Sequence, residues 1–167
     1  MSERENLLDR LLVARFRRIC RRNSGFGSGL AGYAGAMDQV RQIAAAGDER
    51  RRAIIDADLR DLFSRPVLAV LRPVARRWPD GLARVVVRLM PAGFRWLVGP
   101  IAVRDATTIK IPRCRFLAEG GADACLRVCR TPTASFFAEQ VGLRAELRPD
   151  LTAGSCTIRF GTSAVSR

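Results

Sequence analysis

The end of the chain, VGLRAELRPDLTAGSCTIRFG (residues 141–161), carries the clearest strand pattern in the sequence. Apolar and polar residues alternate on both sides of a polar segment, Pro149–Gly154, and the apolar positions are Leu143, Ala145, Leu147, Cys156, Ile158 and Phe160. Such alternation is typical of strands with one buried face, and proline and glycine between two such runs are typical of a turn. The stretch therefore predicts an antiparallel hairpin.

A helix is expected just before this hairpin. Residues 122–140 follow the Gly120-Gly121 turn signal, and Thr131-Pro132 predicts a kink or break, because proline removes a hydrogen-bond donor. Before the helix, short strands are expected from a period-2 pattern at Ile101, Val103, Ile109, Ile111 and Phe116. Residues 98–167 thus read as a β-α-β-β unit.

Residues 1–97 have the apolar spacing of helices. Helices are expected from about residue 5 to 22, over Tyr33–Ala46, from Asp48 onward, and over Leu82–Leu89. The 167 residues lie within the size range of one domain. The prediction is an α+β fold in a single domain, residues 1–167, in which a helical part (1–97) packs on the small β-α-β-β unit (98–167).

Composition limits the chemistry. The chain contains no histidine, which excludes Ser-His-Asp and Cys-His catalysis, His-ligated haem and zinc sites with His ligands. The formal net charge of +13 favours anionic partners, either nucleic acid or lipid headgroups. Basic residues are spread along the whole chain and aromatic residues are only 7%, so no specific nucleic-acid recognition is expected.

The most apolar stretch, Leu82–Val103, is interrupted by arginines and Pro91, so it is not expected to span a bilayer. It has two interpretations: an amphipathic helix packed on the core, or a helix on a membrane surface with Arg84 and Arg88 on one face and Trp96 as an interfacial anchor. The first residues, Met1–Asn6, do not resemble a secretory signal. A cytoplasmic protein is expected, with peripheral attachment to the inner membrane as an option.

Four of the five cysteines fall in the last 54 residues. Cys125 and Cys129 are one helical turn apart, and Cys114 and Cys156 stand at the ends of two expected strands, which would be adjacent and face the helix. Four thiolates without imidazole are the ligand set of an all-cysteine iron–sulfur cluster or structural zinc. The other interpretation is that these cysteines are small buried hydrophobic residues.

Several motifs across the chain resemble the β-carotene isomerase family of carotenoid and strigolactone metabolism. They are Leu8-Asp9-Arg10-Leu11, Gly32-Tyr33-x-Gly35, Trp96-Leu97-Val98-Gly99-Pro100, Cys114-Arg-Phe-Leu, Cys125-x3-Cys129-Arg-Thr-Pro-Thr, Ser135-Phe136-Phe137, Val141-Gly142, Pro149-Asp150 and Ser155-Cys156-x3-Phe160-Gly161.

The resemblance implies cis/trans isomerisation of a carotenoid or a related polyene at an iron centre, either single iron or an iron–sulfur cluster, with zinc as the alternative metal. It implies Cys114, Cys125, Cys129 and Cys156 as the metal and cofactor ligands. Trp96, Phe136 and Phe137 are candidate contacts for a hydrophobic substrate. The other interpretation, which is favoured for Phe136 and Phe137, is that they pack in the core. No catalytic acid or base is identified.

Two other functions remain open. One is a non-enzymatic module, stabilised by a four-cysteine metal site, that binds lipid or another protein. The other is cyclisation or rearrangement of an isoprenoid on the same scaffold.

Overall fold

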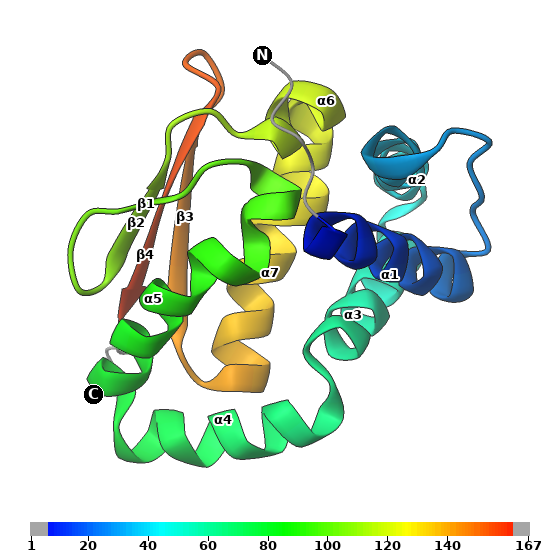
Figure 1. Ribbon diagram of the computed structural model, residues 1–167. Helices are drawn as coiled ribbons and strands as arrows, with labels where there is room; N and C mark the ends of the chain where they lie inside the picture. The colour runs from blue at the N-terminus through cyan, green and yellow to red at the C-terminus, as the bar shows by residue number, and fades with distance from the viewer. Residues whose placement is uncertain (1–6, 162–167) are drawn as a thin grey trace.

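Five helices form the N-terminal part of the protein in the computed structural model, which describes residues 7–161 (Figure 1). They are α1 (Leu7–Ser24), α2 (Gly32–Ala45), α3 (Asp48–Phe63), α4 (Arg65–Arg77) and α5 (Pro79–Val98). Pro66 and Pro79 stand in the first turns of α4 and α5, where a missing N–H costs no helical hydrogen bond. The segment Met1–Asn6, for which no secretory signal is expected, lies outside the described residues.

Four strands form one antiparallel sheet in the order β1-β2-β4-β3. They are β1 (Ala102–Val103), β2 (Thr108–Ile111), β3 (Arg144–Asp150) and β4 (Ser155–Gly161). The hairpin expected from residues 141–161 is confirmed, with Leu147 opposite Ile158 and Pro149 opposite Cys156. The alternate residues of β3 and β4 are buried as the sequence pattern predicts. The α+β class is therefore confirmed.

A long helical column joins β2 to β3. It consists of α6 (Arg115–Ala124), the π-helical turn η1 (Cys125–Arg130), α7 (Thr131–Phe136) and a second π-helical turn η2 (Phe137–Val141). The column begins seven residues before the expected helix, and Phe116 lies in α6 rather than in a strand. Gly121, at a φ of +84°, marks the kink near the predicted Gly120-Gly121 turn.

The expected break at Thr131-Pro132 is not present. The Thr131 N–H bonds to the Leu126 carbonyl five residues back, so α7 starts in a new register. Pro132 then falls in the first turn of α7, where proline is tolerated. The helical column therefore continues through Thr131-Pro132, because the π-helical turn changes the hydrogen-bond pattern just before the proline.

The column packs between the sheet and the N-terminal helices, as Figure 1 shows. The main buried cluster takes side chains from both parts of the chain, among them Met37 of α2, Val87 of α5, Val141 of η2 and Phe160 of β4. No helix within residues 7–161 combines the length and apolarity that a membrane crossing requires.

Candidate functional site

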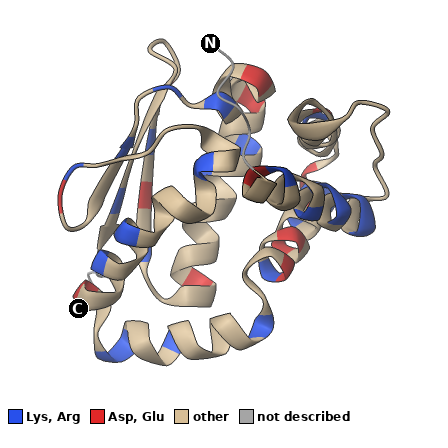
Figure 2. Ribbon diagram, in the orientation of Figure 1, with Lys and Arg blue, Asp and Glu red and all other residues tan. Residues whose placement is uncertain are grey.

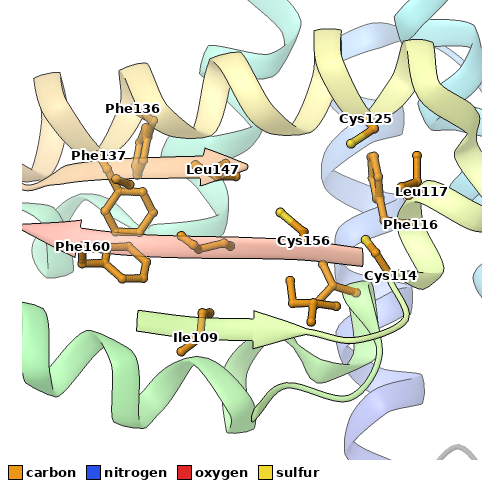
Figure 3. Packing of buried hydrophobic residues seen from close by; sticks show 14 of the residues in the cluster. Ile109, Cys114, Phe116, Leu117, Cys125, Phe136, Phe137, Leu147, Cys156 and Phe160 are labelled. Carbon is orange, nitrogen blue, oxygen red and sulfur yellow. The ribbon is translucent and has the colours of Figure 1, made fainter. Parts of the chain in front are cut away.

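Only one of the four clustered cysteines lies in a strand. Cys156 lies in β4 opposite Ile111 of β2, whereas Cys114, which was expected to end a strand, comes three residues after β2 ends, at the N-cap of α6. The Cys114 backbone N–H donates to the Gly154 carbonyl at 2.8 Å, which ties the start of α6 to the β3–β4 turn. In Figure 3, Cys114 and Cys156 lie on the side of the sheet that faces the helical column, where Cys125 is. The sheet and the column therefore bring these three residues to one region of the core.

The other pair, Cys125 and Cys129, lies on the π-helical turn η1. Cys125 is buried and Cys129 is half-buried as a residue. The Cys129 thiol lies close enough to Cys125, Cys114 and Cys156 for the charge of each to raise its pKa, in addition to the larger effect of burial. Cys129 thus completes a cluster of four thiols that three segments of the chain bring together.

The thiols of this cluster favour their protonated form. Burial is the largest cause that raises the pKa of Cys114 and of Cys125 above the usual value of a thiol. Burial, followed by the charges of Cys114 and Cys125, raises the pKa of Cys156 to about 12. A metal that binds here has to displace these protons, as thiolate ligation always requires.

Soft thiolate ligands suit iron or zinc, so the chemistry of the donor set fits either metal. Among residues 7–161, however, no three Cys, Asp or Glu side chains are grouped closely enough to hold a metal ion as they stand. The cluster therefore supplies the right ligands, and metal binding requires the sulfur atoms to draw together.

An apolar cavity of about 110 Å³ lies next to the cluster, and Cys129 belongs to its wall. Side chains from α1, α2, α3, α5, the helical column and the sheet line it. Half-buried apolar residues at the border of α3 and α5 form part of the wall, namely Leu62, Phe63, Met90 and Phe94. The arrangement places a thiol of the cluster in contact with a water-poor space.

One ionisable pair interrupts this apolar wall. Asp58 of α3 and Cys20 of α1 are both buried and both line the cavity. The Asn23 amide donates to one Asp58 carboxylate oxygen at 2.8 Å. Burial raises the pKa of Asp58, and desolvation together with the Asp58 charge raises the pKa of Cys20. Asp58 was not among the predicted site residues, although it stands three and four residues after Ile55 and Ile54, which is the spacing of one helix face.

The three aromatic residues proposed as substrate contacts have different surroundings. Phe137 lines the cavity, and its ring packs against Phe63, Phe136 and Phe160 at centroid distances of 5.4–6.1 Å. Phe136 is buried in the core and is not part of the cavity wall. Trp96 is also outside the wall.

Trp96 is only 4% exposed, and its indole N–H donates to the Gly93 carbonyl at 2.8 Å. Its ring packs on Phe16 at 5.5 Å. A side chain held inside the protein in this way cannot anchor it at a membrane surface. In this conformation, Trp96 is a core residue that joins α5 to α1.

Comparisons with known proteins agree with the motifs. Residues 96–167 match the family model described as "Beta-carotene isomerase D27-like, C-terminal". A protein of Medicago truncatula named "Beta-carotene isomerase D27, chloroplastic" is 25% identical over 173 residues, which cover 95% of this chain and 66% of the relative. A protein of the same name from Arabidopsis thaliana is 31% identical over 93 residues, which cover 50% of this chain and 35% of the relative.

No solved structure matches the chain. The chain spans just under two thirds of the Medicago relative, and the Arabidopsis match spans about a third of that protein. The matched segment nevertheless contains all four cysteines of the cluster and the whole sheet. Over residues 96–167, the chain is therefore similar to the C-terminal part of beta-carotene isomerase D27-like proteins.

Proposed function

We propose that this protein is an isomerase of a carotenoid or a related polyene. The observation that carries the proposal is that Cys129 belongs both to the four-cysteine cluster and to the wall of the apolar cavity. A polyene inside such a cavity would lie against a thiol of the cluster. The names of the Medicago and Arabidopsis relatives point to the same reaction.

We propose that Cys114, Cys125, Cys129 and Cys156 hold iron. When bound, iron on thiolates supplies one-electron chemistry, which can lower the bond order of a conjugated double bond and so allow rotation. The apolar wall contributes by excluding water and by confining the chain of the substrate. The absence of histidine fits a reaction of this kind, because rotation about a double bond needs no general base.

The cavity also limits how the substrate enters. Ligand pockets usually measure about 300–1,000 Å³, whereas this one measures about 110 Å³. A long polyene therefore enters only if the half-buried side chains at its border, such as Phe63 and Phe94, move aside. We propose that this happens at the surface of a membrane, where such substrates are dissolved.

Metal content is the first test. The protein purified without oxygen is analysed for iron, sulfide and zinc, and its visible spectrum is recorded. The proposal expects iron and an absorption band in the wild type and their loss in Cys129→Ser. The matched control is Cys20→Ser, which changes a buried cavity thiol outside the cluster and should keep the iron.

Turnover is the second test. The iron-loaded protein is incubated with all-trans β-carotene in micelles, and cis isomers are separated by chromatography. Turnover by the wild type but not by Cys129→Ser supports the proposal. Zinc in place of iron would indicate a structural four-cysteine module, and no cis isomer from an iron-loaded sample would contradict the assigned substrate.

A further inference from the structure

Helix α4 has an unusual surface. Among its thirteen residues, all of them described, Ala75 alone is buried. Val67 and Val70 are exposed on it, and Trp78, the residue directly after the helix, is 61% exposed. A large aromatic side chain and two aliphatic ones in water are unfavourable unless something covers them.

The same segment is strongly basic. Residues 65–98, which form α4 and α5, contain one acidic residue, Asp80, and seven arginines: Arg65, Arg72, Arg76, Arg77, Arg84, Arg88 and Arg95. All seven are exposed, and within residues 7–161 no carboxylate lies within salt-bridge distance of any of them. Figure 2 shows these basic positions along α4 and α5, whereas most acidic residues lie on other elements. The charge of Arg65 is one of the smaller causes that lower the pKa of Asp61, and the positive charge of the other six arginines has no carboxylate within salt-bridge distance in the described part of the chain.

We infer that α4 and the start of α5 form a docking surface for a bilayer that contains anionic lipids. Exposed valines and a tryptophan next to free arginines are the combination that binds at the level of the headgroups. The Trp78 ring lies against Gly81, where a Cβ would collide with it. The glycine thus leaves room for the indole at this exposed position, where it can enter the interface.

Nucleic acid is the other polyanion that this charge could attract. It offers phosphates to the arginines but no apolar phase for Val67 and Val70. A lipid surface satisfies both kinds of side chain at once. The exposed aliphatic residues therefore favour the membrane.

The position of this surface connects it to the cavity. Leu62 and Phe63, which line the cavity, stand at the end of α3 directly before α4, and Met90 and Phe94 line it from α5. Helix α4 leads from the end of α3 to the start of α5 (Figure 1), and the Phe63 and Phe94 rings lie 5.9 Å apart, so the two borders meet near the start of α4. A bilayer bound at α4 would lie beside the side chains that have to move for a polyene to enter. This consequence rests on the proposed function, whereas the docking itself does not.

Binding to vesicles without any carotenoid tests the docking. Vesicles of phosphatidylcholine with phosphatidylglycerol are compared with pure phosphatidylcholine vesicles by sedimentation. The variant Arg72→Gln/Arg76→Gln/Arg77→Gln should bind the anionic vesicles roughly a hundredfold more weakly, because each arginine near such a surface contributes about a factor of five. The matched control is Arg18→Gln/Arg21→Gln/Arg60→Gln, which removes the same charge from α1 and α3 and should bind nearly as the wild type does.

Fluorescence tests the anchor. In a Trp96→Phe background, emission comes from Trp78 alone and should move to shorter wavelength when anionic vesicles are added. Circular dichroism confirms that each variant is folded. No spectral shift, or an equal loss of binding in both arginine triples, would overturn the inference. Binding of an RNA oligonucleotide through Arg72, Arg76 and Arg77 without vesicle binding would also overturn it and assign the surface to nucleic acid.

These outcomes are separate from those of the isomerase proposal. A protein that binds vesicles but isomerises no carotene keeps its docking surface and loses the proposed reaction. A protein that isomerises carotene in micelles but does not bind vesicles keeps the proposed reaction and loses the docking surface.

Discussion

The cavity predicts that one extra methylene group has opposite effects at two buried valines. Val40 of α2 lines the cavity and is 1% exposed. Isoleucine at this position keeps the branched Cβ that valine has and directs one more carbon toward the empty space. Val40→Ile should therefore stabilise the protein.

The size of the effect follows from the cavity volume. An unfilled cavity costs about 24 cal/mol per Å³, so a volume of about 110 Å³ corresponds to about 2.6 kcal/mol, the most that filling could return. A single buried methylene contributes about 0.8 kcal/mol of this amount. For a chain of this length, such a gain raises the melting temperature by about 2–3 °C.

The assay is urea unfolding followed by circular dichroism, with a thermal scan beside it. The matched control is Val87→Ile on α5. Val87 is equally buried but is not part of the cavity wall, so the added methylene should overpack the core and cost about 1–3 kcal/mol. If both variants are destabilised to the same extent, the cavity does not exist in solution and the argument built on it fails.

A polyene probe adds a second measurement. Val40→Ile reduces the space for a ligand, so β-carotene in micelles should bind to it more weakly than to the wild type. Stability and ligand binding should thus change in opposite directions. Tighter binding together with higher stability would contradict the assignment of the cavity as the ligand site.

Three further changes have defined outcomes. Burial raises the pKa of Asp58 in the folded state, so its stabilising contribution is present below the unfolded pKa and is lost as the pH rises through the folded value. Asp58→Asn should therefore gain stability relative to the wild type as the pH rises above about 4. A difference in the free energy of urea unfolding that does not change with pH would refute this. The Tyr33 hydroxyl donates to the Leu97 carbonyl at 2.5 Å, so Tyr33→Phe should cost about 1–2 kcal/mol in the same assay, and a neutral result would mean that water replaces the bond. Gly142 ends η2 at a φ of +82°, so Gly142→Ala should lower stability by about 1–2 kcal/mol, and an unchanged melting temperature would show that the turn relaxes.

Strand positions were the most predictable part of the fold. In β3 and β4, alternation places Leu147 and Ile158 on the buried face, and a local turn sets the register between the strands. The adjacency of the strands near Cys114 and Cys156 was also expected and is confirmed by the pairing of β2 with β4. The alternation and the β3–β4 turn are local features of the sequence, and for that reason they could be predicted.

The helical column was harder to predict because its period changes along its length. A pattern of 3.6 residues describes α6 but not η1, where the hydrogen bonds reach one residue further. Pro132 predicted a break because proline in the interior of a regular α-helix removes a hydrogen bond and clashes with the preceding turn. Only the tertiary structure shows that the register had already changed before it.

The cysteines stood out in the sequence, but their surroundings did not. Spacing placed Cys125 and Cys129 on one helix face and left open whether Cys114 and Cys156 reach it, and nothing in the sequence could show that Cys129 lies near all three and borders a cavity. The wall of that cavity comes from six parts of the chain. Trp96 and Trp78 illustrate the same limit, because hydropathy is equal for both and only packing buries the first and exposes the second.

The two π-helical turns also affect how relatives of this chain are aligned. Each π-helical turn holds one residue more than a regular turn, so a homologue that lacks one residue within 125–130 can pass through this segment as a plain α-helix. The extra residue is taken up inside the wide turn, so its loss leaves Phe136 and Phe137 facing their present neighbours. A single gap in this segment of an alignment would therefore mark the loss of the π-helical turn, and the cavity-facing residues on both sides of the gap would still correspond.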